Sequence, residues 1–176
     1  LGRFFSTGDI DTVPAGALLS WVEPSVDWPS SALPTEPPAG VSRSAFDMAR
    51  GLLLAARRET AEARQALAAS AEASAGGALP LVVLSMLHSR DGEWSEAERL
   101  ARAALERSPR LAVAQYALGV ALGGLDQNDA ARRALESAVA GLPTDPEALL
   151  ALARHLQRQG ETAGATPIVD GRVTEP

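Results

Sequence analysis

The most constraining feature of this chain is a pattern of side-chain sizes that repeats at a fixed interval between residues 44 and 159. Shifting the sequence by one interval, from Gly92 to Asp126, aligns the pattern with itself without insertion or deletion. The pair Leu118-Gly119 marks one copy, and Leu84-Ser85 stands at the same place in the copy before it. A fixed period of about 20–50 residues is typical of proteins built from stacked copies of one supersecondary unit.

Each copy has the pattern of two helices joined by a short polar turn. In the copy at 112–145, apolar residues recur at helical spacing up to Leu122, a polar break follows at Asp126, and Pro143 ends the second run. Such spacing predicts amphipathic helices, and proline predicts a helix end. The sequence therefore predicts helix pairs over 44–77, 78–111 and 112–145, and a single helix over 146–159. Ser95 and Glu98 also have the spacing of a capping box.

Small and large side chains recur in step along the copies, which indicates close packing within each helix pair. The predicted turns fall at Arg58, Gly92, Asp126 and Gly160. A small residue follows at Ala63, Ala97, Ala131 and Ala165, and the next contact position holds Leu67, Ala101, Leu135 and Val169. Small residues let two helices approach, and the larger ones fill the space that remains.

This pattern resembles the tetratricopeptide repeat, a helix–turn–helix unit of about 34 residues with a Leu-Gly pair, a turn glycine, small helix residues and a closing proline. The resemblance implies an all-α fold, a right-handed α-solenoid of antiparallel helix pairs. An unrelated all-α bundle is the alternative, because any amphipathic helix has an apolar face with similar spacing.

The first 43 residues differ from all that follow. Residues 1–43 hold six of the twelve prolines and four of the seven aromatic residues, namely Phe4, Phe5, Trp21 and Trp28. The prolines predict a mostly extended N-terminal segment, with a short helix at 15–22. The aromatic residues favour packing of this segment on a surface, its own or that of a neighbouring copy. A flexible linker is the alternative. Residues 160–176 are predicted to be a C-terminal tail.

Composition excludes several kinds of chemistry. The chain has no cysteine and no lysine, so it has no thiol nucleophile, no cysteine-held zinc and no Schiff-base lysine. The net charge of −6 argues against nucleic acid or an anionic membrane as a partner. No apolar run is long enough to span a bilayer. The arginine and alanine content suggests a bacterial genome, and the compartment stays open.

No catalytic or metal-binding constellation is evident in the sequence. The motifs H-E-x-x-H, G-x-S-x-G and G-x-G-x-x-G do not occur. His88 stands where the other copies have leucine, so we expect it to be partly buried and hydrogen-bonded. His155 follows Arg154, and we expect it to face solvent. We therefore expect no enzyme activity, no cofactor and no metal.

The resemblance places a ligand groove on the concave face, along the first helix of each unit. It implies partner-binding residues at Met48, Leu52, Val82, Met86, Arg90, Val113, Tyr116, Val120, Gly123, Leu150 and Arg154, and Ser89 holds a further groove position. The lysines and asparagines with which some members of the family clamp a carboxylate are missing there. The groove is instead apolar and rich in small residues, which predicts an apolar peptide or helix as the ligand.

Three arrangements of this apolar face remain open. In the first, the N-terminal segment covers the face, either in the same chain or between copies in a homo-oligomer. In the second, a peptide or helix of a partner covers it. In the third, these residues pack within the array and no open groove exists. In function, the leading hypothesis is a non-enzymatic protein–protein interaction scaffold. The alternative is a substrate-recruiting accessory domain of a larger enzyme.

Overall fold

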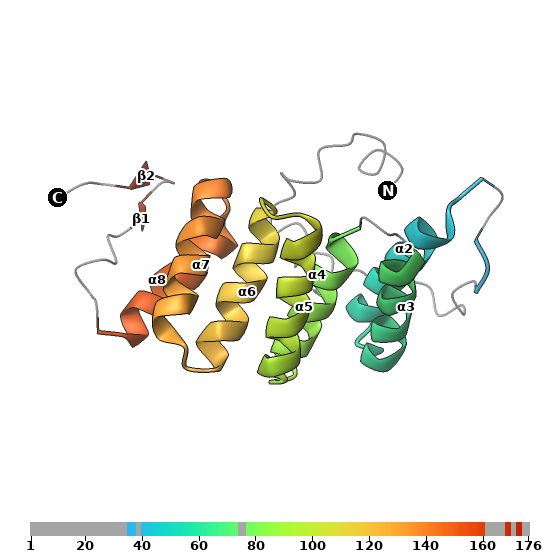
Figure 1. Cartoon of the computed structure of the whole chain (residues 1–176), viewed down its shortest axis with the longest axis horizontal. Coiled ribbons are helices and arrows are strands. Elements are labelled where there is room, and N and C mark those ends of the chain that lie inside the picture. Colours follow the sequence, from blue (N-terminus) through green and yellow to red (C-terminus); the bar gives the residue numbers. More distant parts are fainter. Residues whose placement is uncertain (1–34, 38–39, 74–76, 161–167, 170–171, 174–176) are drawn as a thin grey trace.

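The computed structural model describes residues 35–37, 40–73, 77–160, 168–169 and 172–173. Within these residues the chain forms seven helices and two short strands (Figure 1). The helices are α2 (Arg43–Ala56), α3 (Thr60–Ala73), α4 (Leu79–Arg90), α5 (Trp94–Arg107), α6 (Ala112–Gly124), α7 (Asn128–Gly141) and α8 (Pro146–Arg158). The predicted short helix at 15–22, and most of the predicted N-terminal segment and tail, lie outside the described residues.

The described fold is all-α, as the sequence predicts. The two strands, β1 (Ile168–Val169) and β2 (Arg172–Val173), form an antiparallel pair beyond the last helix, with Ile168 opposite Val173. They lie outside the span of the repeating pattern, which is helical between its turns. Among the helices that the structure describes, none is long and apolar enough to cross a membrane.

The helices pack as consecutive pairs that stand side by side in chain order (Figure 1). The helix α2 packs on α3, α4 on α5 and α6 on α7, and contacts of α3 with α4, α5 with α6 and α7 with α8 join each pair to the next element. The first helices of successive units also touch, since α4 contacts α6 and α6 contacts α8. The space between α4 and α6 is therefore bordered by helices that are not consecutive in sequence.

The turn after the first helix of each unit has the same backbone conformation. The residues with positive φ at these turns are Arg58 (62°), Gly92 (78°), Asp126 (58°) and Gly160 (72°), at the positions that the sequence predicts for the turns. This left-handed conformation suits glycine and costs other residues about 1–2 kcal/mol. Since Arg58, which has no local preference for it, adopts this conformation as well, the packing of the helices helps to determine the turn.

A glycine on the first helix permits the close approach of the two helices in the first and third pairs. A Cβ atom at Gly119 would lie 2.6 Å from Cγ of Leu135, and one at Gly51 would lie 2.6 Å from Cγ of Leu67. The second pair has Ser85 at this position, where its Oγ donates a hydrogen bond to the carbonyl of Ala97 at 2.7 Å. In this pair the first helix has serine where the other pairs have glycine, and the second helix has Ala101 where they have leucine. The second pair therefore divides the contact between both helices, although the side chains of Ser85 and Ala101 together are smaller than that of leucine.

The predicted capping box at Ser95 and Glu98 is wrong. The helix α5 begins at Trp94, its N-cap is Glu93, and no side chain caps it. Because the left-handed turn ends at Gly92, the helix begins before Ser95, which leaves this residue inside the first turn. The carboxylate of Glu98 instead forms an ion pair with Arg102 at 2.7 Å.

Candidate functional site

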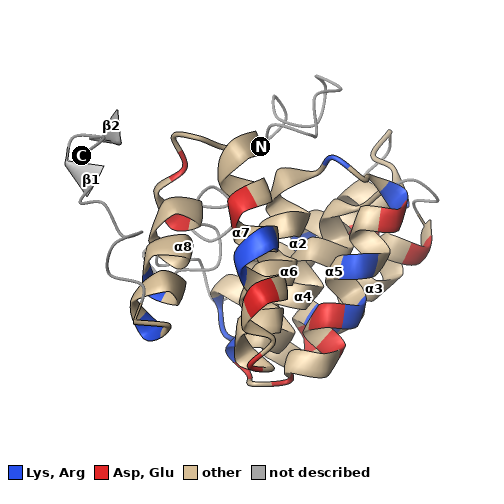
Figure 2. Ribbon diagram, turned by 60° about the vertical axis from the view of Figure 1, so that its left-hand side comes forward, with Lys and Arg blue, Asp and Glu red and all other residues tan. Residues whose placement is uncertain are grey.

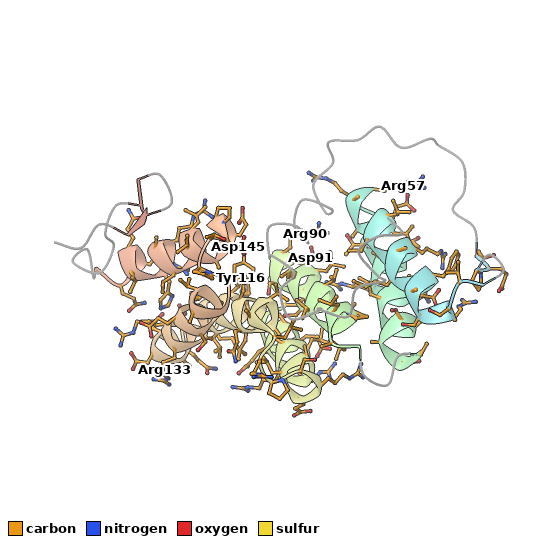
Figure 3. All side chains as sticks on the ribbon, turned by 90° about the horizontal axis from the view of Figure 1, so that it is seen from above. Arg57, Arg90, Asp91, Tyr116, Arg133 and Asp145 are labelled. Carbon is orange, nitrogen blue, oxygen red and sulfur yellow. The ribbon has the colours of Figure 1, made fainter. Side chains whose placement is uncertain are left out.

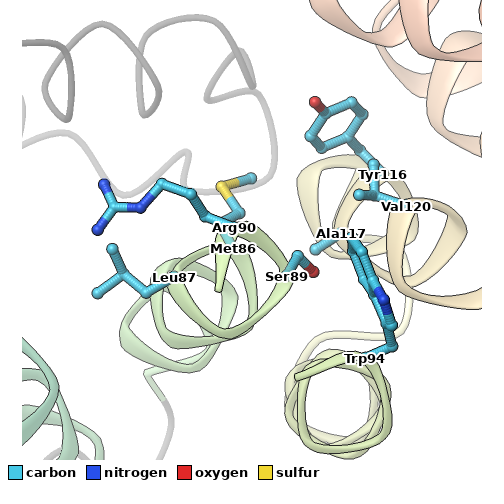
Figure 4. A pocket seen from close by; sticks show the side chains of 8 residues that line it. All are labelled: Met86, Leu87, Ser89, Arg90, Trp94, Tyr116, Ala117 and Val120. Atoms are coloured by element: carbon cyan, nitrogen blue, oxygen red, sulfur yellow. The ribbon is translucent and has the colours of Figure 1, made fainter. Parts of the chain in front are cut away.

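A cavity of about 240 Å³ lies between α4 and α6 (Figure 4). Its lining residues are mostly apolar or aromatic: Met86, Leu87, Ser89, Arg90, Trp94, Tyr116, Ala117 and Val120. The helix α6 has no charged residue, whereas charged residues stand on α3, α5 and α8 (Figure 2). The cavity is therefore a mainly apolar hollow with Arg90 as its charged lining residue.

Three helices supply the walls of this cavity. Met86 and Arg90 extend from α4, Tyr116 and Val120 from α6, and Trp94 from the start of α5 (Figure 4). The indole ring of Trp94 packs so closely on α6 that a Cβ atom at Gly124 would overlap its atoms Cδ2 and Cε3. The absence of a side chain at Gly124 therefore lets Trp94 form one wall.

Ser89 contributes a polar atom without a hydrogen-bond partner. The residue is 7% exposed, and its Oγ is buried and forms no hydrogen bond. Ser85, one helical turn earlier on α4, differs in this respect because it donates to the carbonyl of Ala97. A buried hydroxyl without a partner costs about 1–3 kcal/mol. Ser89 therefore carries a polar group that a ligand in the cavity could satisfy.

Tyr116 has an altered acidity. The residue is 9% exposed. Burial raises the pKa of Tyr116 to about 12, and the carboxylates of Glu147 and Asp145 also raise it, while Arg154 lowers it. Figure 3 shows Tyr116 and Asp145 close together. The hydroxyl of Tyr116 therefore stays protonated at neutral pH, where it can donate a hydrogen bond.

We expect the protein to lose stability as the pH rises from about 10 to about 12. The unfolded chain ionises Tyr116 near its ordinary pKa of 10.0, whereas the folded chain ionises it at about 12. The contribution is therefore complete below pH 10 and is lost as the pH approaches the folded pKa, by about 2–3 kcal/mol. Tyr116 is the only tyrosine, so the ultraviolet absorbance of its phenolate reports the folded pKa directly. Urea unfolding of a Tyr116→Phe variant should lack this loss, and a phenolate that forms near pH 10 in the folded protein would contradict it.

A polar cluster links the cavity rim to the first helix pair. Arg64 on α3 forms ion pairs with Asp91 at 2.8 Å and Glu93 at 3.1 Å, and His88 Nδ1 lies 2.5 Å from Glu93 Oε2. Hydrogen bonds from His88 and Arg64 lower the pKa of Glu93. The expectation that His88 is partly buried and hydrogen-bonded is confirmed, since 14% of its side chain is exposed.

At the mouth of the cavity, Arg90 makes two polar contacts. Its guanidinium donates to Thr60 Oγ1 at 3.2 Å and lies 3.7 Å from Asp91 Oδ1. Its side chain is 40% exposed. Figure 3 shows Arg90 and Asp91 side by side. Such an exposed pair contributes little to stability, so the guanidinium can exchange these contacts for an anionic group of a ligand.

The structure brings together four of the residues predicted to bind a partner: Met86, Arg90, Tyr116 and Val120 line the cavity. Four others lie in the core, with exposures of 5% or less: Met48, Leu52, Val82 and Val113. Gly123 is buried beneath α8, where an added Cβ would face Arg158 and His155. Leu150 and Arg154 are exposed on α8. The predicted groove is therefore reduced to its middle part, where α4 faces α6.

The expectation that His155 faces solvent is wrong. His155 is 1% exposed, and its Nε2 donates to the carbonyl of Asn128 at 3.0 Å. It occupies the face of α8 that packs on α7 and α6, so it attaches the last helix to the helix pair before it. In the part of the chain that the structure describes, no three His, Asp or Glu side chains gather as metal ligands would.

Three lining residues were not predicted as site residues: Leu87, Ala117 and Trp94. The sequence places Trp94 two residues after the turn glycine, which suggests only a structural role between helices. In the sequence, the pair Gly123-Gly124 was the available signal that an aromatic ring packs on the end of α6, because two adjacent glycines leave room for it. No family model matches the chain, and no curated protein matches it.

Proposed function

We propose that this chain is a non-enzymatic protein–protein interaction scaffold of the tetratricopeptide type. Its helices α2 to α8 form a right-handed α-solenoid, and the side formed by α4 and α6 binds an apolar peptide or helix of a partner. The observation that carries this proposal is the apolar cavity between α4 and α6.

The periodicity supports the solenoid. The evenly spaced turns at Arg58, Gly92, Asp126 and Gly160 share the left-handed conformation. The close approach of Gly119 to Leu135 recurs in register, two copies earlier, as that of Gly51 to Leu67. A stack of similar units gives each helix pair the same kind of neighbours. The contacts of α4 with α6 and of α6 with α8 support an array whose first helices lie along one side.

The character of the cavity supports a peptide as the ligand. Drug-sized and cofactor molecules occupy pockets of about 300–1,000 Å³, and this cavity has about 240 Å³. That volume suits one or two side chains of a longer ligand. Helical and extended peptides bind by placing apolar side chains into such hollows.

Two other arrangements belong to the same proposal. The N-terminal segment, with Phe4, Phe5, Trp21 and Trp28, is a candidate for the same surface in the same chain or in a homo-oligomer, and it lies outside the described residues. The alternative function is a recruiting domain of a larger enzyme, in which the same surface binds the substrate protein.

A capture experiment tests the proposal. The tagged chain is incubated with an extract of the native host as wild type, as Val120→Arg and as Ala140→Arg. Val120 lines the cavity, whereas Ala140 is exposed on α7 and serves as the matched control. We expect a specific partner that wild type and Ala140→Arg retain and Val120→Arg loses, because the added charge occupies the hollow. A partner that all three proteins retain equally would place the binding surface elsewhere.

A further inference from the structure

We propose that the cavity between α4 and α6 takes one tyrosine or tryptophan side chain of a partner peptide, with its polar edge hydrogen-bonded to Ser89 and an adjacent carboxylate near Arg90. This inference rests on the proposed function and names the residue that the scaffold recognises.

The size and walls of the cavity favour one aromatic ring. An engineered apolar cavity of about 150 Å³ binds benzene, and this one has about 240 Å³. Trp94 and Tyr116 flank it, and the ring of Trp94 stands beside Ser89 and Ala117 (Figure 4). Aromatic rings pack favourably on one another in offset or edge-to-face geometry. A ring packed on Trp94 brings its edge to Ser89.

Ser89 selects a ring that carries a polar atom. Its Oγ is buried and has no partner, so an entering phenylalanine or leucine would leave it unsatisfied. The hydroxyl of tyrosine or the indole N–H of tryptophan would form the missing hydrogen bond. These two side chains combine an apolar body with one polar tip. A site with a polar group of this kind discriminates against an analogue that lacks the bonding atom.

The guanidinium of Arg90, the charged lining residue, favours a carboxylate beside the ring. Arg90 carries the single formal charge on α4 and α6, and its side chain is 40% exposed at the cavity mouth. Arginine holds a carboxylate through two parallel hydrogen bonds. An aspartate next to the aromatic residue of the ligand would complement this guanidinium.

Peptide binding to the full chain tests this inference. The probes are short synthetic peptides of Gly and Ser with a central Asp-Tyr, Asp-Phe, Asp-Leu or Asn-Tyr pair, and isothermal titration calorimetry gives each Kd. We expect the Asp-Tyr peptide to bind wild type about five-fold more tightly than the Asp-Phe peptide, since one hydrogen bond separates them. We expect the Asp-Leu peptide to bind more weakly than both. Equal Kd values for the Tyr and Phe peptides would overturn the inference.

Two serine variants of α4 form a matched pair for this experiment. Ser89→Ala should abolish the preference for Tyr over Phe and keep the affinity for Phe. Ser85→Ala loses its internal hydrogen bond to Ala97 and should keep the preference. In Arg90→Gln, the Asp-Tyr and Asn-Tyr peptides should bind equally. A preference that survives in Ser89→Ala would contradict the role of Ser89, and circular dichroism confirms that each variant is folded.

A last peptide-binding measurement tests whether the cavity is filled by a partner or by this chain's own N-terminal segment. If Trp21 or Trp28 fills the cavity, the Trp21→Ala/Trp28→Ala variant will bind the Asp-Tyr peptide at least about ten-fold more tightly than wild type. That result would overturn the proposal that the ring comes from a partner. We expect the same Kd as for wild type. A loss of the captured partner in Val120→Arg together with equal Tyr and Phe affinities would leave the scaffold function standing and refute only this inference.

Discussion

Replacement of Gly119 by valine is expected to lower the free energy of unfolding by about 3 kcal/mol. A Cβ atom at this position would lie 2.6 Å from Cγ and 2.8 Å from Cδ2 of Leu135, and 3.1 Å from the backbone nitrogen of that residue. Leu135 is 2% exposed, so neighbouring side chains restrict its movement. Urea unfolding followed by circular dichroism measures the loss. The matched control is Ala140→Val on the exposed face of α7, where a change within about 0.5 kcal/mol is expected.

A second pair of substitutions tests whether volume exchange explains the loss. Leu135→Ala alone should cost about 3 kcal/mol through the cavity that it leaves. Gly119→Ser combined with Leu135→Ala copies the arrangement that Ser85 and Ala101 have in the second helix pair. The double variant should therefore lose at least about 1 kcal/mol less free energy of unfolding than the sum of the losses in Gly119→Ser and Leu135→Ala. Additive costs would show that the two positions do not share space.

The second large effect concerns Trp94 and Gly124. Trp94→Ala should cost about 3 kcal/mol, near the lower end for a large aromatic, because the ring is only partly buried. Gly124→Ala should also destabilise, by about 2 kcal/mol, because its Cβ would overlap the indole ring. Thermal and urea unfolding of both variants measure these losses.

The sign of the Gly124 change should reverse when the ring is absent. In the Trp94→Ala background, Gly124→Ala should stabilise the protein by less than about 1 kcal/mol, since alanine is the better helix residue and Gly124 is the last residue of α6. A Gly124→Ala variant that destabilises equally in both backgrounds would mean that the ring does not pack on this glycine. The variant without the ring also lacks one wall of the cavity, so peptide binding serves as a second measurement.

Much of the helical architecture follows from the sequence, because the periodic pattern is local information. Proline at 143 and 146 and the turn at Asp126 indicate where helices end and begin, and α7 and α8 follow these signals. Caps were less predictable. Ser95 has the right spacing from Glu98, yet the N-cap of α5 is Glu93, two residues earlier, because the geometry of the turn at Gly92 outweighs the preference of the side chain.

The candidate site was only partly predictable for a physical reason. The repeating pattern predicts which residues occupy the first helix of each unit, but not how far the next helix covers them. Val82 and Val113 are fully buried. Met86 and Val120, one and two turns further along the same two helices, line a cavity instead. The difference depends on the spacing of α4 and α6, which Trp94 helps to maintain from a third helix.

The sequence alone determined that this chain forms paired helices with evenly spaced turns, because side-chain size and periodicity act between near neighbours. The tertiary structure decided which side chains are buried between neighbouring helix pairs and which line a cavity. It buried His155, left the hydroxyl of Ser89 without a partner and placed Trp94 beside Gly124. These contacts join residues of different helices, and the distances between helices depend on all the side chains that separate them.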